Sequence, residues 1–304
     1  MKYWTAFSLI LLILVLVPQL FIVKASLNST PIEERKTGRR YPVEVVSKKV
    51  LETRIENGEV TTFYEYTVRT SRETLIKMIN EDWETYEDIK YSRGQSAADE
   101  WRSKQLEVMK NAPEYVESKI KVVKHGEKCI TYGSMLCSMI WPWIVENDPV
   151  NINFVEDGSA GNVFSHMIYD LDTLWYSAIG SGLYGFIDNT ANGGSSEWKT
   201  QDSQVDYPPG AWYIRNHTRL YDGGYDSHQF GYWSMGGVHH EHWNWWPPPC
   251  GHIVVDWDDI RDSLATDFED ESFVSDVEFI DEGNQGWPQG VETDGYSARI
   301  WLTD

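Results

Sequence analysis

The chain has 304 residues, with 47 acidic side chains against 26 basic ones and a formal net charge of −21 at pH 7. A field of this sign repels phosphate, so the composition argues against binding to nucleic acid or to anionic lipid surfaces. The length is sufficient for a full hydrophobic core in one large domain or two modest ones.

The first 25 residues have the features of a targeting segment. Lys2 precedes an apolar run over residues 7–23, and residues 23–25 (Val-Lys-Ala) suit a signal peptidase. The run is also close to the ~20 residues that span a bilayer. Residues 1–25 are therefore predicted to be either a cleavable signal peptide or an N-terminal transmembrane anchor. Both place the remainder outside the cytoplasmic membrane, secreted or tethered, and the polar residues 26–41 predict a linker.

A β-hairpin and then helices are predicted after this linker. Asn57-Gly58 lies between two β-rich stretches, and this dipeptide indicates a hairpin because both of its positions adopt positive φ. Apolar residues then recur at helical spacing, with Ser71 or Thr74 as the cap. A second helix is expected over about residues 96–110, and a short third one after Pro113. We interpret these elements as scaffold.

The three cysteines leave one pairing to consider. Cys129 and Cys137 lie symmetrically about Gly133, so a hairpin turning at that glycine would bring the two side chains together. Outside the cytoplasm such a disulfide is permitted. The sequence does not fix the connectivity, and Cys250 would be free or would pair only after a rearrangement.

The next stretch predicts an entry turn, a helix and a loop. A turn at residues 148–151 (Asp-Pro-Val-Asn) leads into a strand, and residues 163–179 form an amphipathic pattern that carries His166. A lone histidine on such a helix is more often a packing or surface residue than a ligand. Residues 180–209 are rich in Gly, Ser, Asn and Asp and predict a long loop.

The strand predicted at residues 212–221 carries the first candidate site residues. Alternation places Arg215, His217 and Arg219 on one face. Guanidinium groups bind carboxylates and phosphates in bidentate fashion, so Arg215 and Arg219 are candidate anion-binding residues. His217 is a candidate catalytic acid–base. The alternative is that these cations pair with the chain's own acidic residues.

A histidine cluster follows the partner strand predicted at residues 229–238. In extended conformation His240 and His242 point to one side, while His239 and Glu241 point to the other. His240, His242 and His252 are therefore a candidate metal site, with zinc as a fitting divalent transition metal. The alternative is a set of ordinary loop histidines, and the cofactor stays open.

Three further groups are candidates for binding or catalysis. The tryptophans Trp243, Trp245 and Trp246 could form a platform for a sugar or a lipid head group, or could serve only in packing. His252 lies near the end of a short strand, and Asp256 fits the cap of the helix that follows. His252 and Asp256 are candidate catalytic residues together with His217.

Part of this region resembles a known family, the C-terminal domain of the LssY type. The resemblance covers about residues 148–268. It rests on the following motifs: Asp148-Pro149-Val150-Asn151, Arg215-x-His217-x-Arg219-Leu220, Tyr232-Trp233, His252-Ile253, Asp256, Asp258 and Arg261-Asp262. It implies that Arg215, His217, Arg219, His252 and Asp256 lie together. Val254 and Ile260 stand where the family has acids, and the family's activity is unsettled, so the resemblance implies no reaction.

The sequence as a whole predicts an α+β fold. An N-terminal hairpin and helices (residues 42–147) precede a mixed or antiparallel sheet with flanking helices and acidic C-terminal strands (148–304), as one compact unit. The functional hypothesis is an extracytoplasmic hydrolase or transferase that acts on an anionic envelope lipid or glycan. The alternative is a non-catalytic envelope module that binds glycan or lipid or is purely structural. The oligomeric state stays open.

Overall fold

The structure is a computed structural model. It describes residues 38–303 except for the following short stretches: 57–58, 126–130, 134, 141–142, 157–159, 174, 178–182, 189–193, 208–213, 227–230, 245–250 and 284–292. The predicted signal or anchor lies outside the described residues. Among the helices that are described, none is both long enough and apolar enough to span a bilayer.

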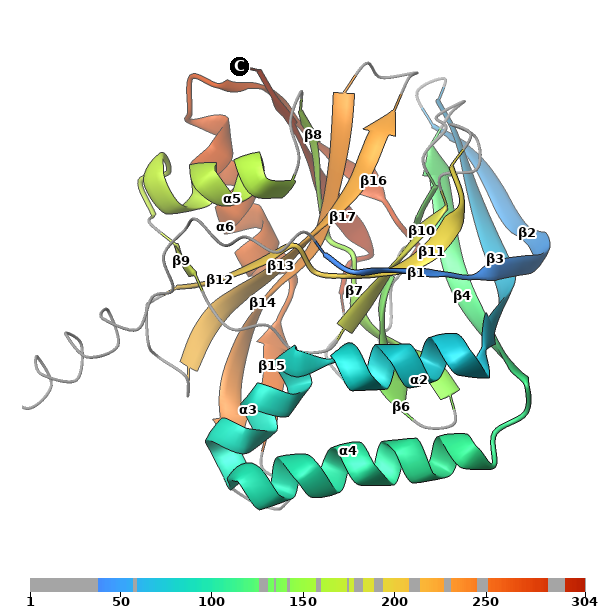
Figure 1. The fold of residues 1–304 in the computed structure, drawn as a ribbon. Coiled ribbons are helices and arrows are strands. Elements are labelled where there is room, and N and C mark those ends of the chain that lie inside the picture. Colours follow the sequence, from blue (N-terminus) through green and yellow to red (C-terminus); the bar gives the residue numbers. More distant parts are fainter. Residues whose placement is uncertain are drawn as a thin grey trace, which may run out of the picture.

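The fold is α+β, as predicted, with two sheets and helices at their margins (Figure 1). The first sheet contains β1 (Arg40–Pro42), β2 (Glu44–Glu56), β3 (Glu59–Ser71), β4 (Tyr115–His125), β5 (Thr131–Gly133), β6 (Met135–Ile140), β7 (Trp143–Pro149), β10 (Leu183–Asp188) and β11 (Ser196–Thr200). The second sheet contains β8 (Ile152–Glu156), β9 (Tyr176–Ser177), β12 (Ser203–Tyr207), β13 (Ile214–Asp226), β14 (Gly231–Asn244), β15 (Gly251–Asp256), β16 (Val274–Asp281) and β17 (Tyr296–Leu302). Only the pairing of β17 with β8 is parallel among the described strand pairs, so the second sheet is mixed.

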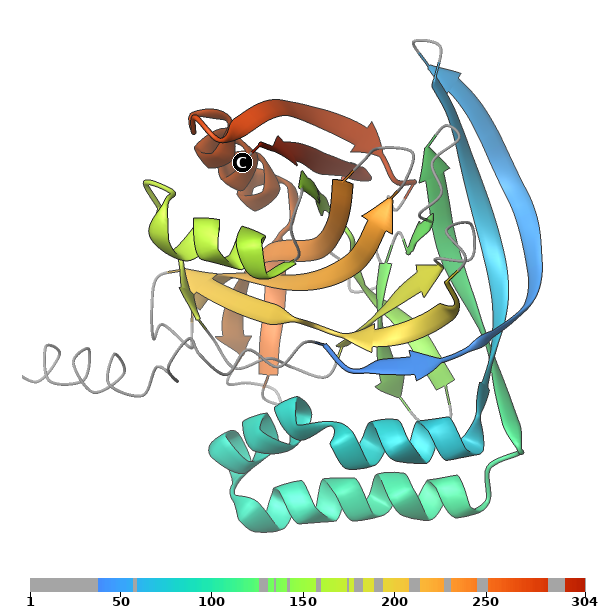
Figure 2. The same cartoon turned by 45° about the horizontal axis from the view of Figure 1, so that its top comes forward.

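The helices are α2 (Arg72–Glu81), α3 (Trp83–Arg93), α4 (Gln95–Lys110), α5 (Ala160–Tyr169) and α6 (Asp258–Glu269). Figure 2 shows α2, α3 and α4 together at one end of the molecule, and α5 and α6 beside the second sheet. The long β2–β3 hairpin forms one edge of the first sheet, and β1 forms the other. The second sheet thus has helices on one face and the first sheet near its other face.

The predicted hairpin and first helix are confirmed. Glu56 pairs with Glu59, so β2 and β3 enclose the predicted turn. The Ser71 hydroxyl accepts a hydrogen bond from the Thr74 amide at 3.0 Å and caps α2. The short helix expected after Pro113 is wrong. That segment is β4, because its alternating apolar side chains are buried against β3 and the core.

Two predicted irregular segments are ordered strands. The last residues of the expected linker form β1, which pairs with β11. The loop expected over 180–209 contains β10, β11 and β12, and its composition obscured the buried Phe186, Trp198 and Val205. The helix expected over 163–179 ends at Tyr169. Because β10 and β11 belong to the first sheet although they follow residue 148, that sheet contains strands from both sides of residue 148.

The hairpin that motivated the Cys129–Cys137 pairing is not formed. Strands β5 and β6 do not pair with each other; both pair with β10, through Tyr132↔Ile187 and Cys137↔Tyr184. The chain therefore continues along β10 past Gly133 instead of turning back. Cys129 and Cys250 lie outside the described residues, so the disulfide remains a prediction without its geometric basis.

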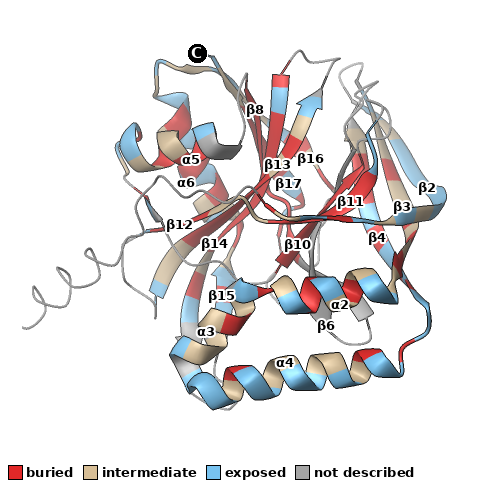
Figure 3. Cartoon of the chain, viewed as in Figure 1, coloured by how far each residue is buried: buried red, intermediate tan, exposed pale blue. Residues whose placement is uncertain are grey.

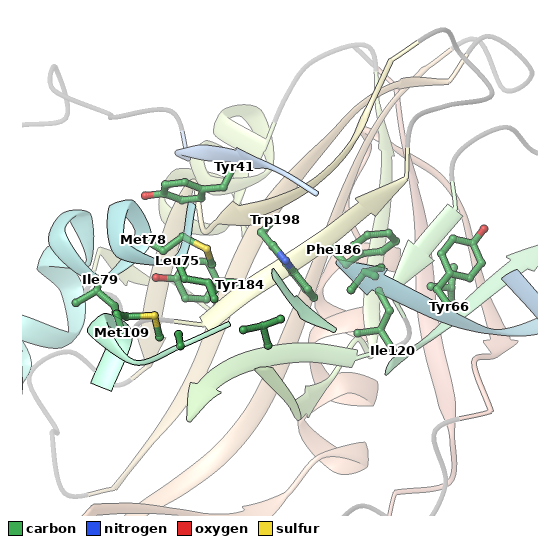
Figure 4. Close-up of a cluster of buried hydrophobic side chains, with 14 residues drawn as sticks. Tyr41, Tyr66, Leu75, Met78, Ile79, Met109, Ile120, Tyr184, Phe186 and Trp198 are labelled. Atoms are coloured by element: carbon green, nitrogen blue, oxygen red, sulfur yellow. The ribbon is translucent and has the colours of Figure 1, made fainter. Parts of the chain in front are cut away.

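The hydrophobic core has three parts. One is formed by side chains of the first sheet and of α2, where Tyr41, Met78, Tyr184, Phe186 and Trp198 pack together (Figure 4). A second lies between the second sheet and the helices α5 and α6. Figure 3 shows the buried residues running along the strands of both sheets, with exposed ones on the outer helix faces.

The third part of the core joins the two sheets. It contains Leu183 and Ile187 from β10 and Tyr221, Trp233 and Met235 from the second sheet. A side chain at Gly185 would meet Met235 at 2.7 Å and Tyr221 at 3.1 Å, so the glycine allows this close approach. The second sheet therefore has its odd-numbered β14 positions turned toward the first sheet.

Candidate functional site

A polar network lies on the face of β12, β13 and β14 that is turned toward the first sheet. We define the β13 network as Asp206, Arg215, His217, His239 and Glu241. The antiparallel register places Asp206 opposite His217, His217 opposite His239, and Arg215 opposite Glu241. Directly opposed residues share a face, which is why alternation on three strands brings these side chains together. This confirms the predicted strand that carries Arg215, His217 and Arg219.

Each of the two histidines binds a carboxylate. His217 Nδ1 lies 2.6 Å from Asp206 Oδ1, and His239 Nε2 lies 3.2 Å from Glu241 Oε2. An ionised carboxylate only accepts hydrogen bonds, so the ring nitrogen that faces it carries the proton. His217 is therefore protonated at Nδ1 and His239 at Nε2. The two rings have centroids 5.2 Å apart and an interplanar angle of 45°.

Arg215 links the two carboxylates. Its Nη1 donates to Asp206 at 2.5 Å and its Nε donates to Glu241 at 2.5 Å. The Arg215 side chain is 15% exposed, whereas that of His217 is fully buried. The guanidinium therefore lies at the rim of the network and the His217 imidazole at its centre.

The pKa directions agree with this arrangement. Burial opposes ionisation of Asp206 and Glu241, but the hydrogen bonds that they accept from His217 and His239 and the charge of Arg215 outweigh it. The pKa of both carboxyls is therefore lowered, that of Glu241 well below its usual range. Burial, helped by the charge of Arg219, lowers the pKa of His217 to about 3. At neutral pH the network holds ionised carboxylates and a neutral His217.

One nitrogen of each imidazole lacks a hydrogen-bond partner. His217 Nε2 and His239 Nδ1 are both buried, and neither has a partner in the described part of the chain. In the neutral form of each ring, the nitrogen that does not face the carboxylate carries a lone pair and no proton. For His217 the lowered pKa favours this neutral form at neutral pH. A buried acceptor without a partner costs about 1–3 kcal/mol, so these atoms suit a proton, a water or a metal ion.

The predicted anion-binding arginines are both engaged with the protein's own carboxylates. Arg219 Nη1 donates to Asp148 Oδ2 at 2.6 Å, and both side chains are buried. Arg215 binds Asp206 and Glu241. The interpretation that these cations pair with internal acids thus matches the geometry, and an external anion would have to compete with those carboxylates.

The candidate metal ligands His240 and His242 lie on the other face of β14. Their rings are 5.3 Å apart, and His240 Nδ1 lies 2.7 Å from Asn216 Oδ1. Across the described residues, no group of three or more His, Cys, Asp or Glu side chains is placed to hold a metal ion. The side chain of the third predicted ligand, His252, is outside that description. Its backbone pairs with Trp243, one position beyond the His242↔Ile253 pair.

Asp256 lies one residue before the N-cap of α6, which is Trp257 and not Asp256 as predicted, and it is not in the β13 network. It pairs with His240, and its Oδ1 accepts the Asp259 amide at 3.0 Å, which is a capping contact at the start of α6. Burial raises the pKa of its carboxyl. Of the predicted tryptophan platform, the Trp243 side chain and the whole of residues 245–246 lie outside the described residues.

Sequence reasoning placed Glu241 and His239 on one side of β14 but did not assign them to the site with His217. Asp206 and Asp148 were not predicted as site residues, since Asp206 fell in the expected loop and Asp148 in the expected entry turn. An alternating segment over 203–207 (Ser-Gln-Val-Asp-Tyr) was the available signal. The pairing of these acids depends on strand register, which the sequence does not show.

Comparisons of this chain with protein families, with curated proteins and with solved structures find no match. The candidate site therefore rests on its own geometry.

Proposed function

We propose that this chain is an extracytoplasmic hydrolase or transferase whose reaction is centred on His217. The observation that carries the proposal is a neutral, buried imidazole with Nδ1 held by Asp206 and a lone pair at Nε2. This arrangement lets Nε2 activate a water or hydroxyl group, while the carboxylate fixes the tautomer and stabilises the positive charge that develops.

The proposed substrate is an anionic envelope lipid or glycan. Arg215 supports this part, because it is the cation at the rim of the β13 network and a substrate phosphate or carboxylate could share its guanidinium with Asp206 and Glu241. The location outside the cytoplasm is proposed from residues 1–25. Kinship with the LssY-type domain stays a proposal on the motifs quoted above.

A second candidate is a non-catalytic envelope module. Its supporting observation is burial: His217, His239 and Glu241 are each at most 3% exposed, and both arginines bind internal carboxylates. In this role the network would only hold β12, β13 and β14 in register.

A matched pair of variants separates the two candidates. The full chain is assayed against phosphomonoester, phosphodiester, carboxylic ester and glycoside substrates, with His217→Asn and His240→Asn beside it. An asparagine amide retains the hydrogen bond to Asp206 but has no atom at the Nε2 position. The hydrolase proposal expects an activity that His217→Asn reduces about 100-fold or more while His240→Asn keeps it. An activity that survives His217→Asn, or none with any substrate in the presence of added zinc, favours the non-catalytic module.

A further inference from the structure

The two bare imidazole nitrogens lie on one side of the same strand pair. His217 on β13 and His239 on β14 are directly opposed, and each is at most 1% exposed. Their other nitrogens are held by Asp206 and Glu241. A metal-binding histidine typically donates its second nitrogen to a carboxylate in this way, which fixes the ring and raises its basicity.

The charge of the surroundings favours a cation. Three carboxylates (Asp148, Asp206 and Glu241) stand against two guanidinium groups (Arg215 and Arg219) among the described side chains of this region. The excess is one negative charge if both histidines are neutral. A bound cation offsets that charge, whereas a water leaves it and an anion adds to it.

We propose that His217 Nε2 and His239 Nδ1 bind a transition-metal ion of the zinc class. Imidazole nitrogens select zinc and its first-row neighbours, while magnesium and calcium prefer oxygen ligands. The two imidazoles are one ligand fewer than the three protein ligands of a typical catalytic zinc site, so water or substrate would fill the remaining positions. The site differs from the sequence-predicted set His240, His242 and His252, because it lies on the opposite face of β14.

This inference shares its site with the proposed function and specifies it further. A metal held by both histidines would lower the pKa of a bound water, and that water would replace the bare imidazole as the activated group. Metal binding itself does not depend on the reaction, so it can be measured without a substrate.

The test is zinc binding by the full chain, purified in a mild detergent and stripped with chelator. Bound zinc is measured by elemental analysis after gel filtration, and affinity by competition with a chromogenic chelator. Two variants remove one bare nitrogen each and keep the carboxylate contact. His217→Asn retains a donor at the Nδ1 position, and His239→Gln retains one at the Nε2 position. The control is the double variant His240→Asn/His242→Asn on the other face.

One equivalent of zinc is expected for the unmodified chain and for the control. A loss of affinity of more than about 100-fold is expected for His217→Asn and for His239→Gln, and about 10–100-fold for Asp206→Asn, which acts only through His217. Zinc that follows His240 and His242, or no zinc in the unmodified chain, overturns the inference.

A measurement on the unmodified chain covers the case in which a variant fails to fold. Long-range ¹H–¹⁵N spectra of the imidazoles should show zinc-dependent shifts at the Nε2 of His217 and the Nδ1 of His239, and at no other described histidine. Shifts at His240 and His242 instead contradict the site. Zinc binding at His217 and His239 without any hydrolase activity would sustain this inference and reject the proposed function. Activity without zinc would do the reverse.

Discussion

Arg215 donates one hydrogen bond to Asp206 and another to Glu241, and so connects the carboxylates that orient the two buried histidines. The histidines themselves do not hydrogen-bond to each other; they share this cation through their carboxylates. The β13 network is therefore one electrostatic unit, and a change at the rim is expected to reach its centre.

Removing that cation is predicted to destabilise the fold. Arg215→Ala leaves Asp206 and Glu241 largely buried without their shared counter-charge, and breaking a buried pair in this way costs about 3–5 kcal/mol. The free energy of unfolding from urea titration measures the loss. The control is Arg69→Ala, whose pairs with Glu44 and Glu117 are more exposed and are worth at most about 1 kcal/mol. Equal losses for both variants would contradict the role of Arg215.

The free energy of unfolding is predicted to decrease as the pH is lowered, because of His217. Its pKa is about 3 in the folded chain and ~6.5 when unfolded, so the unfolded state takes up a proton first as the pH falls below ~6.5. The folded state therefore loses about 1.4 kcal/mol per pH unit between these values, and the contribution is complete above ~6.5. Between pH 7.5 and pH 5, in the presence of chelator, the unmodified chain should lose roughly 2 kcal/mol more than His217→Asn.

The carboxyls Asp206 and Glu241 act in a lower window. Their folded pKa values are depressed, so the stability that they contribute is present above the unfolded values near ~4 and is lost only as the pH falls further. A difference between the unmodified chain and His217→Asn that first appears below pH 4 would therefore assign the effect to the carboxyls instead of the imidazole.

A backbone contact beneath the network gives a packing prediction. A methyl group at Gly236 would lie 2.5 Å from the Arg219 carbonyl oxygen, which is main chain of the paired strand and cannot rotate away. Gly236→Ala is therefore expected to lower the free energy of unfolding by about 1–3 kcal/mol. Ser234→Ala on the same strand is the control. It removes a buried hydroxyl without a hydrogen-bond partner in the described part of the chain and should change stability by less than about 1 kcal/mol.

The location of the chain has its own test. Residues 1–40 are fused to a reporter enzyme that is active only outside the cytoplasmic membrane, and the same fusion is made without residues 7–23. The first fusion should be active and the second inactive, because the apolar run is the signal that directs export. N-terminal mass analysis of the exported protein then distinguishes cleavage after Ala25 from a retained anchor. An inactive first fusion would contradict the extracytoplasmic assignment.

Local signals predicted the elements whose side chains follow a simple period. The Asn57-Gly58 turn, the capped helix at Ser71 and the alternation of Arg215, His217 and Arg219 all depend on neighbours within a few residues. The strands between 183 and 207 were missed because glycine, serine and aspartate outnumber the buried Trp198 and Val205 there. These strands are stabilised by pairing with strands distant in the sequence, which their own composition does not indicate.

The candidate site could be predicted only in part, for a different reason. His217 was evident as a polar residue among cations on one strand face, whereas its partner Asp206 is 11 residues away on a neighbouring strand. Asp148 meets Arg219 across 71 residues. Such contacts depend on strand order and register, which no local pattern encodes. The predicted grouping of His217 with His252 and Asp256 rested on the family resemblance, whereas the strand register places Asp256 beside His240, outside the β13 network.

The most direct test of the central claim is the protonation state of His217 in the unmodified chain. Long-range ¹H–¹⁵N spectra are recorded from pH 8 to pH 5 with chelator present, and His217→Asn assigns the resonance. We predict a neutral imidazole with its proton on Nδ1 and a bare Nε2 over this whole range. A proton on Nε2, or a His217 that becomes charged above pH 5, would contradict this prediction, because the nitrogen proposed to act on water or metal would then be occupied.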